Sequence, residues 1–161
     1  MNRGIHNTRG TTIIELIIYM GIFGTLLIVF THFFLTVLDI KRESEAISYT
    51  AQDARFILQR LTYDIKNATS ITTPSSLGSQ GSSLVLVVNG STNTYALAGS
   101  TLTLNGVRLH SFNTNISAVT FRRLGNTNGK NALQIAYTVT GKVRKSIGLK
   151  STIIQTAVAI R

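Results

Sequence analysis

The stretch Ile13–Leu38, IIELIIYMGIFGTLLIVFTHFFLTVL, decides how the rest of this chain has to be interpreted. From Leu16 to Leu38 it contains no Asp, Glu, Lys or Arg. An α-helix of that length covers roughly 30 Å, which is enough to cross the hydrocarbon core of a bilayer. Arg3 and Arg9 precede the stretch without any acid, and this favours a cytoplasmic N-terminus. The sequence therefore predicts one N-terminal membrane-spanning helix.

Glu15 is the unusual residue of this stretch. A carboxylate in lipid costs on the order of a few kcal/mol and usually marks a function, although a position at the membrane interface would also explain it. A secretory signal peptide would have a shorter apolar core and a small-residue cleavage site after it, and Asp39–Ala46, DIKRESEA, matches that poorly. A plain signal anchor fits the hydrophobicity but leaves Glu15 unexplained.

The segment Arg9–Ile18, RGTTIIELII, resembles the type IV prepilin signature: a short basic leader ending in Gly, an apolar block, a Glu at the fifth mature position and a long apolar helix. The resemblance implies cleavage between Gly10 and Thr11 by a prepilin peptidase and methylation of the new amine of Thr11. It also implies that Glu15 meets the N-terminal amine of a neighbouring subunit, or its own. Thr11 replaces the Phe that is common there, and His32 stands where major pilins often carry a helix-kinking Pro.

The missing Pro favours a minor pilin or a pseudopilin, of a type IV pilus or a type II secretion-like filament. The resemblance further implies a single-pass protein of the bacterial cytoplasmic membrane that later enters an extracytoplasmic filament. Its partners would be other pilins or pseudopilins, bound through the N-terminal helix, and no cofactor is expected. A plain single-pass protein without a filament is the rival hypothesis.

The helix is expected to continue beyond the apolar stretch, to about Lys66. Apolar residues recur there at steps of four and three, which places them on one helical face: Ile47, Ala51, Ala54, Leu58, Leu61 and Ile65. The expected organisation is a leader at 1–10, a filament-core helix at 11–38, an amphipathic continuation at 39–68 and a β-rich head at 69–161.

The head reads as short strands separated by turns, after a loop at 72–83. The expected strands are Ser83–Val88, Thr94–Leu97, Thr101–Leu104, Val107–His110, Ala118–Leu124, Ala132–Val139, Val143–Leu149 and Thr152–Ile160. Asn89-Gly90, Asn105-Gly106 and Thr140-Gly141 are turn signals. The predicted fold class is α+β, with the long helix packed on an antiparallel sheet, and the resemblance implies the same lollipop arrangement.

The charge distribution excludes several kinds of active site in the head. The net charge is +10, and the segment from Ile65 to the end has ten bases and no acid. Acid–base catalysis by paired carboxylates is therefore impossible within it. The chain has no Cys, and His110 is the only His of the head, so a zinc site cannot form there. We expect no enzymatic activity, and we expect His110 on a surface strand.

The bases of the head are candidates for anion binding. They form two groups in the sequence: Arg122 and Arg123, and then Lys142, Arg144, Lys145 and Lys150. Contact with DNA or an acidic surface polymer would be electrostatic and steeply salt-dependent. A solvated basic surface is the alternative, and strand alternation places Arg144 and Lys145 on opposite faces.

Overall fold

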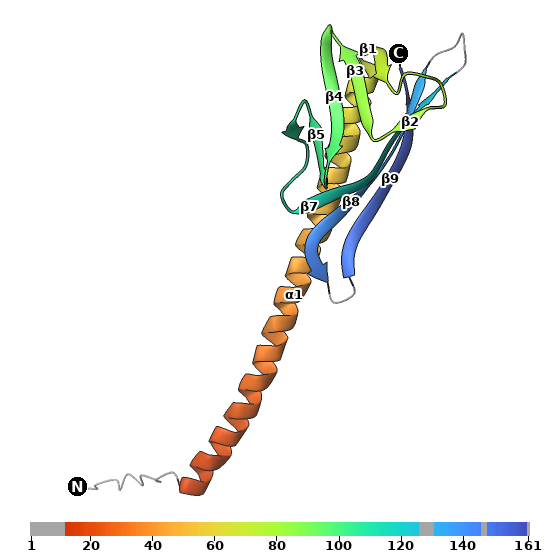
Figure 1. The fold of residues 1–161 in the computed structure, drawn as a ribbon. Helices are drawn as coiled ribbons and strands as arrows, with labels where there is room; N and C mark the ends of the chain where they lie inside the picture. The colour runs from red at the N-terminus through yellow and green to blue at the C-terminus, as the bar shows by residue number, and fades with distance from the viewer. Residues whose placement is uncertain (1–11, 126–130, 146–147, 161) are drawn as a thin grey trace, which may run out of the picture. The chain divides into compact units, whose positions relative to one another are not determined.

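The structure is a computed structural model that describes residues 12–125, 131–145 and 148–160. The chain divides into two compact units, Met1–Lys41 and Arg42–Arg161, called here the N-terminal unit and the head unit. The helix α1, Ile13–Lys66, contributes its first part to the N-terminal unit and its second part to the head unit (Figure 1). An apolar stretch of 18 residues in α1 has a mean hydropathy of 2.4, and none of its residues is buried inside the chain. By length and composition, α1 can cross a membrane.

Within the residues that the structure describes, the head unit contains nine strands in two antiparallel sheets. The α+β class is therefore confirmed, while the single sheet expected from the sequence is wrong. The five-stranded sheet has the order β1-β3-β4-β5-β6 and the four-stranded sheet the order β2-β7-β8-β9. The bounds are β1 Ala68–Thr73, β2 Gln80–Gly81, β3 Ser83–Val88, β4 Ser91–Ala98, β5 Thr101–Leu104, β6 Val107–Arg108, β7 Thr114–Leu124, β8 Ala132–Lys145 and β9 Gly148–Ala159.

The Asn-Gly signals correctly located two hairpins of the five-stranded sheet. Asn89 and Gly90 connect β3 to β4, and Asn105 and Gly106 connect β5 to β6. All four residues have positive φ, between 50° and 82°. A two-residue turn of this kind matches the twist of antiparallel strands and needs Asn or Gly at both positions. The loop expected at 72–83 is partly wrong, because β1 extends to Thr73 and β2 lies within it.

The helical face buried in the head unit differs from the expected apolar stripe. Ala54, Leu61 and Ile65 are buried as expected, but Ile47 is 40% exposed. The residues one position before five of the expected ones are also buried, and three of these five are polar: Ala46, Thr50, Asp53, Ile57 and Asp64. The apolar pattern missed this face because Thr50, Asp53 and Asp64 are polar and were not counted in it.

A bulge in β7 lets three of its side chains enter one core. Ile116, Val119 and Phe121 are all buried, although simple alternation cannot bury both Ile116 and Val119. The pairing of β7 with β8 shifts register between Ser117 and Thr120, and Ala118 has a φ of 51°. An extra residue at this point turns Val119 back toward the core.

The turn expected at Thr140-Gly141 does not exist. Gly141 lies inside β8, which continues to Lys145, and β9 begins at Gly148, so the strand expected at Val143–Leu149 is also wrong. A Cβ at Gly141 would lie 3.1 Å from the Thr50 Oγ1 and 3.6 Å from the Ala46 carbonyl oxygen. The glycine is needed because the helix approaches the strand closely, rather than for a turn.

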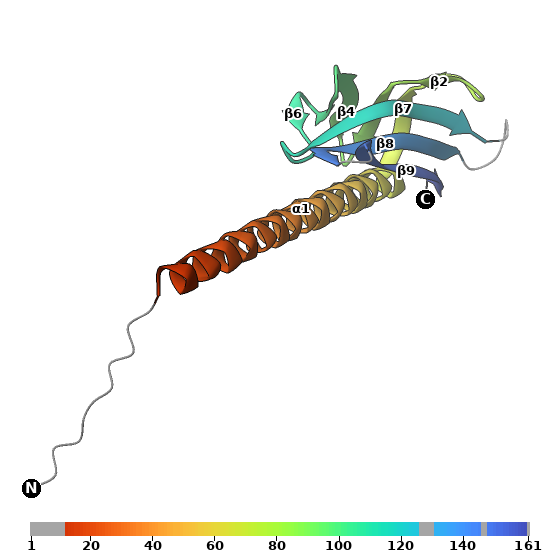
Figure 2. The ribbon, with the colours of Figure 1, turned by 90° about the horizontal axis from the view of Figure 1, so that it is seen from below.

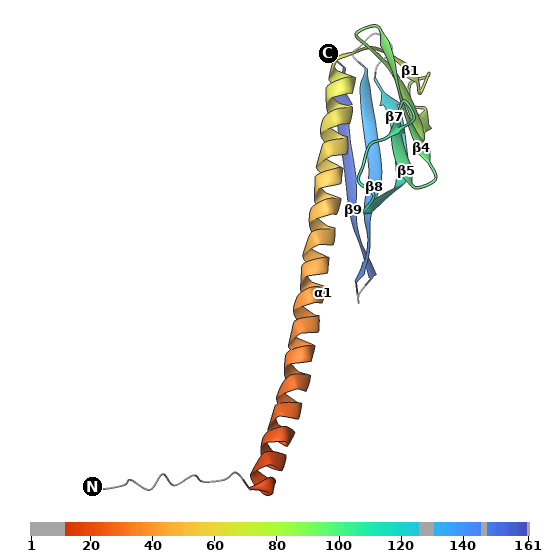
Figure 3. The same cartoon turned by 90° about the vertical axis from the view of Figure 1, so that its left-hand side faces the viewer.

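Both sheets pack on the second part of α1. Figure 2 shows β7, β8 and β9 curving over the helix, and Figure 3 shows β8 and β9 running beside it. One buried tyrosine of each sheet donates a hydrogen bond to the helix. The Tyr137 hydroxyl donates to the Ala54 carbonyl oxygen at 2.7 Å, and the Tyr95 hydroxyl donates to the Asp64 Oδ2 at 2.5 Å. The apolar core around them joins the helix to both sheets.

Candidate functional site

Glu15 lies in the first turn of α1, on a segment whose other side chains are almost all exposed. It is half-buried, and its Oε1 accepts a hydrogen bond of 2.7 Å from the Tyr19 hydroxyl, one helical turn later. Among the residues that the structure describes, no basic side chain pairs with this carboxylate. Tyr19 was not identified from the sequence, although its i+4 spacing from Glu15 is a usable signal.

The backbone around Glu15 suggests a second, local role for it. The Thr12 carbonyl oxygen accepts hydrogen bonds from the amides of Glu15 and Leu16, at 3.0 and 3.2 Å, so Thr12 stands at the start of the helix. Thr12 and Glu15 have the spacing of a capping box, in which a Glu or Gln at the third helical position supports the helix start. A negative charge in the first turn is also favoured by the helix dipole. Any test of Glu15 has to separate its charge from this capping role.

The side chains that follow Glu15 form a continuous apolar surface in the N-terminal unit. Ile17 is 65% exposed, Phe23 61% and Phe33 67%. Single exposed apolar residues are ordinary in soluble proteins, but a surface of this size marks contact with a membrane or a protein. The expected cleavage and methylation positions, Gly10 and Thr11, lie outside the described residues.

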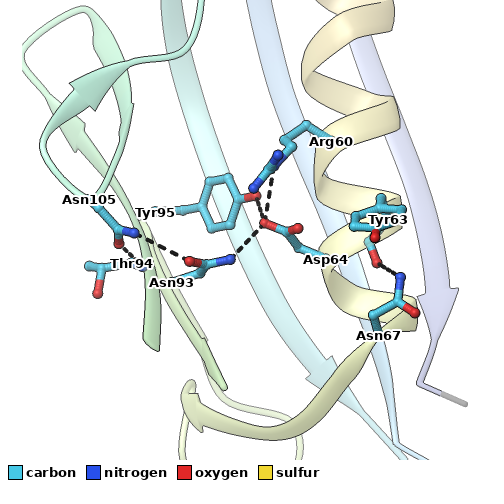
Figure 4. Close-up of polar contacts among 8 residues, drawn as sticks. All are labelled: Arg60, Tyr63, Asp64, Asn67, Asn93, Thr94, Tyr95 and Asn105. Atoms are coloured by element: carbon cyan, nitrogen blue, oxygen red, sulfur yellow. Dashed lines mark hydrogen bonds and ion pairs between the residues drawn. The ribbon is translucent and has the colours of Figure 1, made fainter. Parts of the chain in front are cut away.

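In the head unit, a network around Asp64 fixes the end of α1 to the five-stranded sheet (Figure 4). The buried Asp64 Oδ2 accepts hydrogen bonds from the Tyr95 hydroxyl at 2.5 Å and the Asn93 amide nitrogen at 3.1 Å. The half-exposed Arg60 guanidinium donates to the same oxygen at 3.3 Å. Burial, followed by the hydrogen bond to Asp64, raises the pKa of Tyr95, so this hydroxyl stays protonated as a donor.

A second network, around Asp53, fixes the segment between β6 and β7. The Asp53 Oδ2 accepts hydrogen bonds from the Ser111 amide at 3.1 Å, from the Ser111 hydroxyl at 2.7 Å and from the Thr114 hydroxyl at 2.5 Å. Asp53 and Asp64 are eleven residues apart, which is close to three helical turns, so both project from one face. Neither carboxylate has a sequence pattern that indicates a function, because both lie on the helix and their partners lie in the head.

His110 belongs to the Asp53 network, and its expected place on the surface is wrong. It is only 7% exposed, and its Nδ1 lies 3.0 Å from the Thr114 Oγ1. Because Thr114 donates its one proton to Asp53, it accepts from His110, which places the imidazole proton on Nδ1. Burial, and next the charge of Arg108, lower the pKa of His110. The neutral imidazole of His110 therefore helps to hold Thr114 in the Asp53 network.

The structure does not bring the basic candidates together. Arg122 and Arg123 lie on β7, paired with Gln134 and Leu133 of β8, whereas Lys142 lies beyond Gly141 at the other end of the same strand pair. About eight residues of strand, or roughly 26 Å, separate the two groups. Arg123 is also occupied: its guanidinium donates to the carbonyl oxygens of Ser75 at 2.8 Å and Pro74 at 3.3 Å. Arg122 remains exposed.

The second basic group stays together, at the free end of the β8–β9 hairpin. Lys142 and Lys150 are exposed. Arg144 pairs with Leu149 and Lys145 with Gly148 along the backbone, and the side chains of Arg144 and Lys145 lie outside those described. Strand pairing thus places the four bases within a few residues of one another.

Comparisons with protein-family models, curated proteins and solved structures found no match. Within the described ranges, no three His, Cys, Asp or Glu side chains are grouped closely enough to hold a metal ion. The candidate site of this chain is therefore the first turn of α1 with the apolar surface that follows it.

Proposed function

We propose that this chain is a structural subunit, held in a membrane by the first part of α1 and assembled with similar subunits through that same surface. The resemblance of Arg9–Ile18 to prepilins makes it a minor pilin or pseudopilin, in a type IV pilus or a type II secretion-like filament. It would be processed at the cytoplasmic membrane of a bacterium, with the N-terminus inside. The head unit would then lie outside the membrane.

One observation carries this proposal: a single carboxylate stands in the first turn of α1, and the large apolar side chains that follow it as far as Val37 are exposed. Burying Glu15 in lipid or among other helices is unfavourable unless it meets a cation. Cleavage after Gly10 would create an α-amine four residues before it. Attraction between that amine and Glu15 of a neighbour would fix how far one subunit lies along the next.

The decisive substitution is Glu15→Gln. Glutamine serves at the third position of a capping box as well as glutamate, so the helix start is retained while the charge is lost. We expect Glu15→Gln to insert into membranes as the native chain does, and to be lost from isolated filaments. Membrane fractionation and immunoblotting of sheared filaments measure the two properties separately.

Thr12→Ala is the matched control, since it weakens the helix start and leaves the carboxylate. Its expected effect on assembly is small. Intact mass of the native protein completes the test: it should lack residues 1–10 and carry one added methyl group. Assembly of Glu15→Gln at the native level, or a native chain that keeps its first ten residues, would contradict the proposal.

The head unit fits an outward-facing structural module better than a nucleic-acid-binding one. Its two basic groups lie at opposite ends of the β7–β8 pair, and Arg123 supports the loop at 74–75. A protein that binds a DNA duplex through phosphate contacts needs its basic residues on one continuous surface. The remaining basic group lies on the β8–β9 hairpin.

A further inference from the structure

The β8–β9 hairpin runs toward the end of the head unit where the chain enters from the apolar segment. Tyr137 of β8 contacts Ala54, and four residues later Gly141 lies against Thr50 and Ala46. The strand thus runs antiparallel to the helix, toward Arg42. Figure 3 shows β8 and β9 continuing beside the helix after β7 has ended.

The length of the hairpin brings its bases to the start of the head unit. From Gly141 to Lys145, β8 advances about 13 Å. From Ala46 back to Arg42, the helix covers only about 6 Å. The end of the hairpin therefore reaches at least the level of Arg42. Because Arg42 follows Leu38 by four residues, this end of the head unit is tethered close to any bilayer that holds the apolar segment.

The charge at this end is positive, and the hairpin supplies it. Arg42, Glu43 and Glu45 of the helix sum to −1, whereas the hairpin contributes four bases: Lys142, Arg144, Lys145 and Lys150. Two of these, Lys142 and Lys150, are exposed, and next to them Leu149 is 55% exposed. Bases interleaved with an exposed aliphatic side chain are typical of segments that lie on anionic membrane surfaces.

We propose that the described exposed side chains near the end of the β8–β9 hairpin, Lys142, Leu149 and Lys150, bind the anionic headgroups of the bilayer in which the chain is inserted. This would hold the head unit against the membrane before assembly, and leaving the membrane would release it. The inference rests on the membrane insertion in the proposed function and is independent of Glu15 and of filament assembly.

The test uses the full chain in lipid nanodiscs. Since the chain has no Cys, Ser151→Cys gives a unique fluorophore position, exposed and next to Lys150. Ser91→Cys, at the start of β4, is the control position: Ser91 pairs with Val88, which pairs with Ala68 just after the helix ends. Energy transfer to an acceptor on the lipid headgroup reports how close each position lies to the bilayer.

With phosphatidylcholine alone, transfer from position 151 should be modest. It should rise when phosphatidylglycerol is included and fall again near 1 M salt, where the Debye length is about 3 Å. Position 91 should not respond. The double variant Lys142→Gln with Lys150→Gln should weaken docking about 25-fold, because each lysine contributes a factor of about five. The matched pair Lys66→Gln with Arg122→Gln removes the same charge from exposed positions away from the hairpin and should leave docking unchanged.

Three results would overturn the proposal. If the chain floats with the discs but position 151 ignores phosphatidylglycerol, the hairpin does not dock, while the proposed function stands. If both double variants weaken docking equally, the attraction belongs to the net charge of the head and not to the hairpin. If duplex DNA binds through Lys142 and Lys150 where phosphatidylglycerol has no effect, the surface serves nucleic acid. A chain that fails to enter the discs would overturn both proposals.

Discussion

The two parts of α1 form one helix by the same local rules and use their side chains in opposite ways. In the N-terminal unit, apolar residues such as Ile17 and Phe23 face outward, and none of the apolar residues that the structure describes there is fully buried. In the head unit, eight helical residues are buried, and three of them are polar. Hydrophobicity alone would therefore suggest that the first part of α1 is buried within the chain, whereas the buried residues lie in its second part. What a helix buries depends on the partner that the rest of the chain provides.

The carboxylates make the contrast sharper. Asp53 and Asp64 are buried and each has several donors within the chain, whereas Glu15 has only the Tyr19 hydroxyl among the described residues. A buried carboxylate with several donors contributes to the stability of its own domain. A carboxylate that lacks a cation within its own chain can instead stabilise an assembly, when another molecule supplies the cation. Substitutions should therefore affect folding in the head unit and association in the N-terminal unit.

Among the polar networks, the largest effect on folding is expected for Asp64→Ala. It leaves the Tyr95 hydroxyl and the Asn93 amide without an acceptor at a buried position, so the head unit should lose about 3 kcal/mol of unfolding free energy. Urea unfolding of the full chain in detergent, followed by near-ultraviolet tyrosine dichroism, measures the loss. Asp64→Asn keeps one acceptor oxygen and should lose less, and Lys66→Ala, at an exposed site two residues later, should be nearly neutral. Equal loss in all three variants would contradict the role given to the Asp64 network.

An intermediate effect is expected from pH, through His110. Because its pKa is lowered in the folded head, the unfolded chain takes up a proton first, near pH 6.5. The stabilisation is fully present above that pH and is lost as pH falls from 6.5 through the lowered folded pKa. The slope should be at most about 1.4 kcal/mol per pH unit.

Unfolding midpoints of the native chain and of His110→Gln, measured across this range, check the sign. The variant should have a flatter profile between pH 5.5 and 6.5, a window that lies above the ordinary range of Asp and Glu titration, at about 4. A native profile that is flat there, or a variant as steep as the native chain, would show that His110 does not titrate with unfolding.

The smallest effect is expected in the apolar segment. Ile17→Ala and Phe23→Ala remove large side chains that contact little within the chain, so the unfolding free energy of the head unit should change by less than about 0.5 kcal/mol. The same truncation at Ile57, which is fully buried in the head unit, should cost about 2–5 kcal/mol. If Ile17→Ala and Ile57→Ala have similar effects, the two parts of α1 do not differ as described.

The sequence was sufficient for the helix and for two of the three turns expected from it. Uninterrupted helical periodicity predicted α1 to Lys66, and Asn89-Gly90 and Asn105-Gly106 predicted two hairpins correctly, because each depends on residues close in sequence. Gly141 was assigned to a turn because its actual reason, the approach of Thr50 and Ala46, lies about ninety residues earlier. The division into two sheets depends on equally distant contacts and left no local signal.

The candidate site divides in the same way. Glu15 could be identified because a charge within an apolar run is visible without any structure. The networks of Asp53 and Asp64 could not, since a carboxylate on an otherwise solvated helix has the same local pattern whether or not Tyr95 or Thr114 lies opposite. The two groups of basic residues are visible in the sequence. Their separation along β7 and β8 could be found only from the register of the strands.

The spacing of Asp53 and Asp64 has a mechanical consequence. Each residue fastens a different part of the head to the same helical face, about 16 Å apart along the axis. Tension applied along α1 would shear both fastenings at once instead of peeling them open in turn. A head attached in this way resists traction best in the lengthwise direction, which is the direction in which a filament assembled as proposed would pull on its subunits.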